Sequence, residues 1–383
     1  MVQEPIYILA FLTLLIFASE WLVRNTVLKP LSAALLVILL GALFANIGWI
    51  PSASNASPVY DAIFTYVAPA SIFYLLLGVR LKALRKAGAP MLLAFVLGAI
   101  GTVLGVVVAL QWVNVEAVFG KNYAAVAGMM AGSYTGGSAN FNAVALHFGM
   151  VREGAVFTGL VVADNIITAL WMLVTLSLPA LMMRWRPHRQ QQQKQKPEQQ
   201  NDNTDERESL GTMRFALMLA LGLFVVWASD HFSVMLKDMG FEIPSILILT
   251  SIALLLAQLP FIQRLPGAKV LGLFTMHLFL VVVGAFCELG ALAEVGQDAM
   301  AIVWFTAIIV LVHGLFFVLA ALFLKSDWHI VAIASQANIG GAGTAIALAK
   351  SFKREDLLLP AILAGALGTA LGTYVGFAVA FWL

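Results

Sequence analysis

Two stretches of this chain share one pattern, and they decide how the rest of the sequence is interpreted. Residues 124–150 read AAVAGMMAGSYTGGSANFNAVALHFGM, and residues 329–352 read HIVAIASQANIGGAGTAIALAKSF. Each is a long apolar run interrupted near its middle by a Gly-Gly pair, with Ser, Thr, Asn or Gln on either side. Because glycine adopts backbone angles that other residues resist, each run is predicted to break at its glycine pair.

The sequence around these stretches has the composition of a membrane protein. Of 383 residues, 61% are hydrophobic and 11% are charged, and the mean hydropathy is +0.93. A soluble domain carries about 25% charged residues, and one core could not bury this much apolar surface. The composition excludes a soluble enzyme and a nucleic-acid binder, and the single cysteine, Cys287, excludes a disulfide scaffold.

Apolar runs long enough to cross a bilayer as helices, at about 20 residues each, follow one another along the chain. They occupy approximately residues 5–23, 31–50, 59–79, 89–113, 121–149, 155–183, 213–232, 243–260, 268–289, 299–324, 328–350 and 357–382. Between the sixth and seventh runs lies a Gln-rich, charged stretch that is predicted to be a cytoplasmic linker without a fold. The chain therefore divides into residues 1–183, a linker at 184–211, and residues 212–383.

The two halves of the chain resemble each other. LLIFASEW at 14–21 matches LFVVWASDH at 223–231, and SYTGGSANFNAVALHF at 133–148 matches ANIGGAGTAIALAKSF at 337–352, with the glycine pairs in register. An internal duplication explains these matches, and many secondary transporters are built from two such repeats.

The placement of Lys and Arg residues separates two topologies, because cytoplasmic loops carry an excess of these residues. If every run crosses the membrane, and the basic loop at residues 80–86 is cytoplasmic, the 22 basic residues divide 11 inside and 11 outside. If the two Gly-Gly runs instead enter and leave on one side, 19 fall inside, and only Lys121, Arg152 and Lys237 fall outside. The second topology is therefore predicted.

The predicted fold follows from this topology. It is an all-α polytopic membrane protein with two inverted repeats of five transmembrane helices, each repeat containing a re-entrant or broken hairpin that carries the Gly-Gly motif. A bent helix that crosses the membrane completely is the alternative geometry at these two positions. Both termini are expected on the periplasmic or extracellular side of a bacterial inner membrane.

The polar residues around the two breaks form the candidate substrate site. A broken helix leaves backbone N–H and C=O groups without partners at membrane depth, which persists only where protein, water or a ligand satisfies them. The alternative role of these small residues is close helix packing. The candidate substrate-binding residues are Tyr134, Thr135, Gly136, Gly137, Ser138, Asn140, Asn142, Gln336, Asn338, Gly340, Gly341 and Thr344.

A cation that drives transport has its own candidate residues. Asp164 is the acid placed well inside an apolar run, and intramembrane acids usually mark an ion or proton path. Asn165, Ser133 and Ser335 are grouped with it as candidate cation-coupling residues. A sodium ion is expected near Ser138, Asn140, Asn338 and Thr344, whose neutral oxygens suit a weakly bound cation. His277 and His313, in apolar runs, are interpreted as hydrogen-bonded packing residues.

The Gly-Gly motifs also resemble a known family. GSYTGGSANFNAVA and SQANIGGAGTAIALA are similar to the paired signatures of a bacterial membrane family named domain of unknown function 819. More distantly, TGGSAN and IGGAGTAIA resemble the re-entrant loops of glutamate:sodium symporters and 2-hydroxycarboxylate transporters. The resemblance implies a sodium-coupled, elevator-type carrier of small organic anions, which is usually a homodimer. It implies that Gly136, Gly137, Gly340 and Gly341 form the hairpin turns.

We therefore predict a secondary active transporter of a small polar or anionic organic solute, sodium-coupled, with elevator-type alternating access. The alternatives are a proton-coupled carrier that uses Asp164, a passive channel and, least favoured, an intramembrane enzyme that uses Asp164 with His147. The protein is predicted not to be an enzyme and to need no cofactor apart from the coupling sodium ion. Its expected partners are the solute, membrane lipid and a second copy of the chain, and no nucleic acid.

Overall fold

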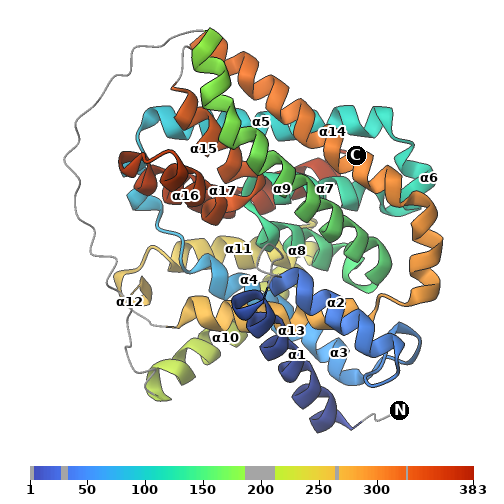
Figure 1. Ribbon diagram of the computed structural model, residues 1–383. Coiled ribbons are helices and arrows are strands. Elements are labelled where there is room, and N and C mark those ends of the chain that lie inside the picture. Colours follow the sequence, from blue (N-terminus) through green and yellow to red (C-terminus); the bar gives the residue numbers. More distant parts are fainter. Residues whose placement is uncertain (1–3, 27–32, 186–211, 264–266, 325–326) are drawn as a thin grey trace.

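A computed structural model describes residues 4–26, 33–185, 212–263, 267–324 and 327–383 (Figure 1). Over these ranges the secondary structure is helical, with no strand. Eight helices in the described residues are long and apolar enough to cross a membrane. The chain is thus an all-α polytopic membrane protein, as predicted. Most of the predicted linker, at residues 186–211, lies outside the described ranges.

The helices follow the predicted apolar runs, three of which are divided in two, and two short helices, Val115–Phe119 and Pro260–Gln263, are added. Their bounds are α1 Pro5–Asn25, α2 Ala33–Asn46, α3 Pro58–Ala62, α4 Ala68–Leu76, α5 Ala89–Trp112, α6 Val115–Phe119, α7 Tyr123–Gly136, α8 Ser138–His147, α9 Gly154–Trp185, α10 Thr212–Asp238, α11 Ser245–Leu256, α12 Pro260–Gln263, α13 Ala268–Ala285, α14 Leu289–Leu324, α15 Trp328–Ile339, α16 Gly341–Ser351 and α17 Leu358–Trp382. A 3-10 segment at Leu81–Ala87 precedes α5.

Two of the predicted spans are shorter than expected. α2 has 14 residues and α11 has 12, which correspond to about 21 Å and 18 Å of helix at 1.5 Å per residue. They occupy the same place in the two halves, second in each. Within the described residues, the ten predicted spans thus correspond to eight helices of full length and these two short ones, and the crossing of the membrane by the short ones stays a prediction.

The third predicted span contains a local widening. α3 and α4 are joined by a π-helical turn at Ile63–Val67, so the three form one continuous helix. Pro69 has no backbone N–H to bond to the carbonyl four residues earlier, and the N–H of Ala68 bonds to Ile63, five residues earlier. A π turn of this kind accommodates the missing hydrogen bond.

The helices form two groups that lie side by side. We call α5, α7–α9 and α14–α17 the core group, and α1, α2, α4, α10, α11 and α13 the outer group. The core group is held by contacts of α5 with α14 and of α7 with α17, and the outer group by contacts of α13 with α2 and α4. Figure 1 shows most of the core group above most of the outer group.

Helix contacts recur between the two halves in matching pairs. α1 packs against α13 as α10 packs against α4, and α7 packs against α17 as α15 packs against α9. In each case, replacing both helices of one contact by their counterparts in the other half gives the second contact. This arrangement agrees with the internal duplication, while the inverted orientation of the repeats in a membrane stays a prediction.

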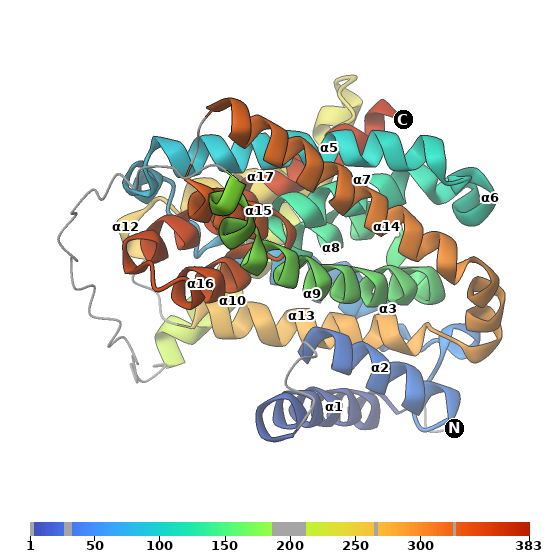
Figure 2. The ribbon, with the colours of Figure 1, turned by 45° about the horizontal axis from the view of Figure 1, so that its top comes forward.

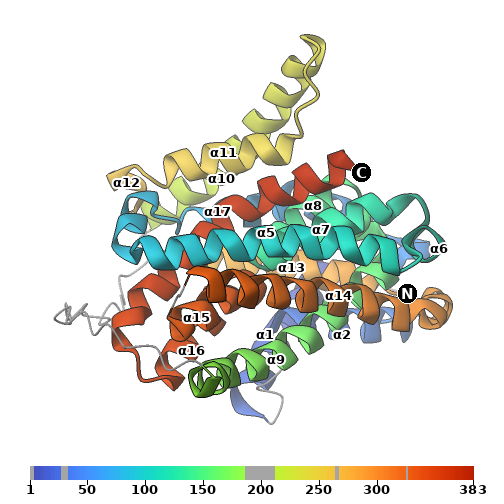
Figure 3. The same ribbon diagram turned by 90° about the horizontal axis from the view of Figure 1, so that it is seen from above.

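The helix bundle has two ends, which we name after an arginine at each. At the Arg152 end, Arg152 pairs with Asp61 at 2.8 Å, and Asn46 donates to the carbonyl of Cys287 at 2.8 Å. At the Arg354 end, Arg354 pairs with Asp327 at 3.0 Å. The start of α5 and α12 lie at this second end, opposite α6 (Figure 3).

The residues that the charge rule predicts outside the cytoplasm share one end of the bundle. Lys121 lies beside α6, at the end that holds Arg152, and Lys237 lies in the last turn of α10. The end of α11 reaches the Arg354 end, where Gln258 accepts from the N–H of Leu81 at 2.9 Å, so its start lies with Lys237 at the Arg152 end. Which end faces the cytoplasm stays a prediction.

Candidate functional site

The first Gly-Gly motif forms a helical hairpin, which we call hairpin 1 (α7 and α8). α7 ends at Gly136, and Gly137 has φ +91°, a left-handed value that favours glycine. The chain then reverses, so that Gly132 on one arm lies against the backbone of Asn140 on the other. The predicted break at Gly136 and Gly137 is confirmed.

The second motif forms hairpin 2 (α15 and α16). α15 ends at Ile339, and the second glycine of the pair, Gly341, has φ +77°. The hydroxyl of Thr344 on the returning arm donates to the carbonyl of Gly341 at 3.1 Å and also approaches that of Gln336 at 3.4 Å. The two motifs thus break at the same position of their alignment.

The hairpins enter the bundle from opposite ends. Hairpin 1 begins beside α6, and the chain after it reaches Arg152, whereas Asp327 and Arg354 flank hairpin 2 at the other end. Figure 2 shows α15 and α16 at the end opposite α6. In both motifs the two arms pack against each other, and α7 also contacts α15. This is the geometry expected of a hairpin, in contrast to a bent helix that crosses the membrane completely. That each hairpin enters and leaves the membrane on one side stays a prediction.

Hairpin 1 is fixed to α17 by an antiparallel set of glycines. A Cβ placed on Gly136 would clash with the carbonyl of Gly368, one on Gly132 would press on that of Gly372, and one on Gly128 would clash with that of Gly376. Glycines four residues apart on both helices allow the backbones to touch. The two series, Gly128–Gly132–Gly136 and Gly368–Gly372–Gly376, are visible in the sequence, but we did not predict that they meet.

Between the hairpins lies His313 of α14, which is fully buried. Its Nδ1 lies 2.9 Å from the carbonyl oxygen of Gly98 and 3.1 Å from the hydroxyl of Thr102, and its Nε2 lies 2.9 Å from the hydroxyl of Ser335. Thr102 in turn donates to the carbonyl oxygen of Tyr134 at 2.9 Å. The ring therefore contacts hairpin 2 directly and hairpin 1 through Thr102.

The protonation pattern of His313 follows from its partners. A carbonyl only accepts, so Nδ1 carries the proton that is donated to Gly98. The indole of Trp171 donates to the Ser335 hydroxyl at 3.0 Å, which leaves that hydroxyl free to donate to Nε2. Both nitrogens of a neutral ring are thus satisfied. The interpretation of His313 as a hydrogen-bonded residue agrees with this, but its place between the hairpins was not predicted.

Asn338, on hairpin 2, is held in one orientation. Its Nδ2 donates to the carbonyls of Phe95 at 3.1 Å and Ala334 at 3.0 Å. Rotating the amide by half a turn would place its oxygen against two carbonyl oxygens, so the assignment of Oδ1 is fixed by chemistry. Oδ1 is buried and has no hydrogen-bond partner.

The side-chain amides of Asn140 and Gln336 each have a hydrogen-bond partner for only one of their two polar atoms. The hydroxyl of Thr373 donates to Oδ1 of Asn140 at 2.7 Å, and that of Thr175 lies 3.2 Å from Oε1 of Gln336. The nitrogen of each amide is buried without a partner. The helices that supply these hydroxyls, α17 and α9, correspond in the two halves.

Buried side-chain atoms without a partner gather at the hairpin tips. Among the described residues, five of six such atoms belong to predicted substrate-site residues. The six are Tyr134 Oη, Thr135 Oγ1, Asn140 Nδ2, Gln336 Nε2, Asn338 Oδ1 and, away from the tips, Thr158 Oγ1. Buried polar groups in proteins are normally paired, so this concentration needs an explanation.

Asp164 lies on α9, half-buried, beside hairpin 1. Thr168 donates to its carboxylate at 3.4 Å, and the hydroxyl of Tyr134 faces the same carboxylate without completing a short hydrogen bond. The amide nitrogen of Asn165 donates to the carbonyl of Val161 at 2.8 Å. The structure therefore places Asp164 with Tyr134, one of the predicted substrate-site residues.

The remaining predicted residues differ in exposure. Ser133, Asn142 and Ser335 are buried, whereas Thr344, Gly340 and Gly341 are half-buried. Ser138 is exposed, although Asn140, two residues later, is buried. The tip of hairpin 1 is thus open at Ser138 and closed at Asn140, so the sodium ligands predicted there do not share one environment.

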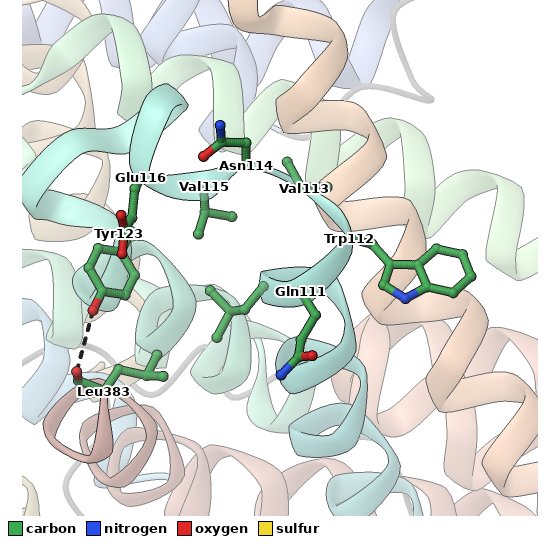
Figure 4. Close-up of a pocket in the computed structure, with 9 residues that line it drawn as sticks. Gln111, Trp112, Val113, Asn114, Val115, Glu116, Tyr123 and Leu383 are labelled. Atoms are coloured by element: carbon green, nitrogen blue, oxygen red, sulfur yellow. Dashed lines mark hydrogen bonds between the residues drawn. The ribbon is translucent and has the colours of Figure 1, made fainter.

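A surface pocket of about 440 Å³ lies elsewhere, at the Arg152 end (Figure 4). It is lined by Leu110 to Glu116, with Tyr123 and Leu383, and the Tyr123 hydroxyl donates to the Leu383 carbonyl at 3.4 Å. It contains none of the hairpin-tip residues. Trp112 at its rim is 78% exposed, so this pocket is a depression in the outer surface and not the candidate site.

The base of hairpin 2 is closed by an ion pair. Asp327 accepts from the N–H of His329 at 2.8 Å, and Arg354 reaches Asp327 at 3.0 Å and Asp356 at 2.7 Å. Burial alone would raise the pKa of Asp327, but the hydrogen bonds from His329 and Arg354 hold it well below the ordinary value. The two ends of hairpin 2 are therefore bound to each other.

The fold and these contacts define a class: a polytopic helical membrane protein whose two broken-helix hairpins meet inside the bundle. The chain belongs to the family described as "Protein of unknown function (DUF819)", whose model matches residues 7–383. It is similar to the uncharacterized membrane protein YjcL of Bacillus subtilis (strain 168), with 29% identity over 369 residues, covering 92% of this chain and 90% of the relative. The resemblance to this family is confirmed, whereas the more distant resemblance to glutamate:sodium symporters and 2-hydroxycarboxylate transporters stays a prediction.

Proposed function

We propose that this protein is a secondary active transporter of a small polar or anionic organic solute, coupled to sodium. The observation that supports it is the cluster of buried, unpartnered polar atoms on both hairpin tips. Each such atom costs about 1–3 kcal/mol when nothing satisfies it. A ligand that binds between the hairpins and is released again would remove this cost only while it is bound.

The side-chain oxygen of Asn338 supports the binding of a cation in particular. Its Oδ1 is fully buried, fixed in orientation and unpartnered, and amide oxygens are ligands that hard cations accept. The described residues hold no group of three His, Cys, Asp or Glu side chains that could bind a metal. A weakly held sodium ion with oxygen ligands therefore fits this position better than a transition metal.

The proposed mechanism is alternating access by movement of the core group against the outer group. The core group contains both hairpins with α9 and α17, so the whole site would move as one unit. Hydrogen bonds between the groups include that of Ser251 on α11 with Tyr374 on α17, at 2.8 Å. Such a movement would have to break this contact.

Coupling to protons is a second candidate, and Asp164 supports it. An acid on a membrane helix next to a hydroxyl of the candidate site could carry a proton with the solute. Under this proposal Asp164→Asn would abolish accumulation driven by a pH gradient. Under sodium coupling through Asn338, the same variant would keep its response to sodium.

The test is the thermal stability of the purified protein in lipid nanodiscs as sodium chloride replaces choline chloride at constant ionic strength. Sodium at ten times its Kd should stabilise the native state by about 1.4 kcal/mol. Asn338→Leu should lose this increment whatever its starting stability. Ser351→Ala is the matched control, because its exposed hydroxyl donates only to Ala347 of the same helix.

Two results would contradict the proposal: no sodium-dependent increment in the unaltered protein, or an equal increment in Asn338→Leu. Repeating the measurement with sets of neutral, zwitterionic and anionic metabolites, with and without sodium, would then identify the class of solute. A solute that stabilises only with sodium present would link the two binding events.

A further inference from the structure

A continuous set of hydrogen bonds connects the two hairpins through a helix that belongs to neither. Its central member is His313 on α14, and its ends are Ser335 on hairpin 2 and the backbone of Tyr134 on hairpin 1. The side chains of Ser335, His313 and Thr102 are at most 1% exposed. Inside a protein such bonds are strong, and an unpaired member is costly.

For a neutral ring, the direction of every bond on the hairpin 2 side follows from the partners of His313. Trp171 of α9 donates to Ser335, Ser335 donates to Nε2 of His313, and Nδ1 donates to Gly98 of α5. If Ser335 moved away, Nε2 would lose its donor inside the protein, and Trp171 would lose its acceptor. Movement at the tip of hairpin 2 therefore disturbs the position of the imidazole.

The hairpin 1 side begins at the same ring. Thr102 lies 3.1 Å from Nδ1 of His313 and holds the carbonyl oxygen of Tyr134 at 2.9 Å. The amide of Gly137, at the turn that follows, donates to Ser133 at 2.7 Å. A shift of the ring therefore reaches the last turn of α7, where the backbone of hairpin 1 reverses.

Close packing makes the ring position sensitive to these partners. A Cβ on Gly98 would clash with Nδ2 of Asn338 and lie 3.2 Å from Cε1 of His313, and one on Gly101 would lie 3.3 Å from the carbonyl oxygen of His313. Gly98 thus leaves room for the imidazole, and Gly101 for the backbone of His313, and little more. A ring in such a space shifts together with its hydrogen-bond partners, because interiors are densely packed.

We infer that His313 is a positioning residue that couples the two hairpins, so that a change at Ser335 on hairpin 2 is felt at the Tyr134–Gly137 turn of hairpin 1. The inference deepens the proposed function, since it would make the two tips bind one solute as a unit. It concerns the protein without solute, so it can be tested, and can fail, independently of transport.

The test is a double-mutant cycle read by amide hydrogen exchange of the full-length protein in nanodiscs. Ser335→Ala removes the donor to Nε2 with little change in volume. It should accelerate exchange in peptides that cover residues 132–140 of hairpin 1 by about five-fold, the factor expected for one lost buried hydrogen bond. Ser351→Ala, on the same hairpin but with an exposed hydroxyl, should leave those peptides unchanged.

The background for the cycle is His313→Asn. An Asn amide can reproduce the Nδ1 donor to Gly98 but does not reach Ser335, so it disconnects hairpin 2. In this background Ser335→Ala should produce no additional acceleration in hairpin 1. The reciprocal variant Thr102→Val, which keeps the shape of Thr102 and removes its hydroxyl, should accelerate exchange in hairpin 2 around Ser335.

The coupling would be refuted if Ser335→Ala changed exchange only within hairpin 2. It would also be refuted if Ser335→Ala accelerated hairpin 1 equally with and without His313, because the disturbance would then travel by another path. The sodium increment in thermal stability is measured separately, so failure of this cycle leaves the proposed transport function standing, and the reverse also holds.

Discussion

Hairpins 1 and 2 break at matching glycines but are held by different surroundings. In hairpin 1, residues 125–136 of α7 are all buried, and their glycines meet those of α17 backbone to backbone. In hairpin 2, α15 is equally buried, but Gly343 and Ala347 of α16 are exposed. The returning arm of hairpin 2 is therefore less covered than that of hairpin 1, in which residues 140–145 of α8 are all buried.

This difference separates the role of the Gly-Gly pair from the role of the neighbouring helix. The Gly-Gly pair sets where the helix breaks, since Gly137 and Gly341 both have positive φ and open space around them. The neighbouring helix sets how firmly the arms are held. Local opening is easiest where few buried contacts are lost, so hairpin 2 is expected to open more readily than hairpin 1.

The largest expected effect comes from the first glycine of each pair. In Gly136→Ala, the added methyl group would clash with the backbone carbonyl of Gly368, which cannot move without shifting α17. We expect a loss of about 3 kcal/mol, at the upper end for overpacking. In Gly340→Ala, the methyl group meets the ends of the Thr344 and Gln336 side chains, which can rotate, and we expect about 1 kcal/mol.

Apparent melting temperatures of the two variants in nanodiscs check this order. Gly343→Ala is the control, because a Cβ there contacts nothing within 4 Å, and it should melt within a degree or two of the unaltered protein. Equal losses in Gly136→Ala and Gly340→Ala would show that hairpin 1 is no more firmly held than hairpin 2.

The sequence predicted these breaks because their cause is local. A glycine pair between apolar segments specifies a turn wherever it lies, and Asp164 could be recognised from its own neighbours in an apolar run. The start of α14 at Leu289 was missed, since LGALAEVGQD at 289–298 contains acids that end an apolar run without ending the helix. The π turn at Ile63–Val67 also gave no periodic signal.

The contacts that complete the candidate site could not be predicted, because they join distant parts of the chain. His313 and Gly98 are 215 residues apart, and Thr373 and Asn140 are 233 apart. A single histidine in an apolar helix gives no indication of which helix it faces. Only the glycine series of α7 and α17 offered a signal, and a series shows that a helix packs closely without identifying its partner.

A smaller effect is expected at the second glycine of each pair, and here the hairpins should behave alike. Gly137 and Gly341 have φ of +91° and +77°, and a Cβ at either would contact nothing within 4 Å. Alanine at these positions costs only the strain of a positive-φ backbone, about 2 kcal/mol. Gly137→Ala and Gly341→Ala should thus lose similar stability in urea or thermal unfolding.

Unequal losses of stability in Gly137→Ala and Gly341→Ala would show how the two hairpins differ. If Gly341→Ala were tolerated and Gly137→Ala were not, hairpin 2 would relieve its strain by moving its exposed arm. If Gly137→Ala were the milder change, the idea that α17 holds hairpin 1 in place would be wrong.

The smallest expected effect lies at the bases of the hairpins. Arg354 connects the end of hairpin 2 to Asp327 at its start, whereas Arg152, after hairpin 1, pairs with Asp61 of α3. The Arg354–Asp327 side chains are 24% and 34% exposed, and both side chains of the other pair are 59% exposed. Arg354→Gln should cost about 1 kcal/mol, and Arg152→Gln, as the control, less than about 0.5 kcal/mol.

The pH dependence of these variants assigns the larger loss to the ion pair. The pKa of Asp327 is lowered in the folded protein, so its contribution is fully present above the unfolded value of about 3.9 and is lost as pH falls below it. The difference in stability between Arg354→Gln and the unaltered protein should therefore be constant from pH 8 to pH 5 and shrink only below about pH 4. A difference that already shrank near pH 6 would mean that Asp327 is not held ionised by Arg354, and that both hairpin bases are equally weakly closed.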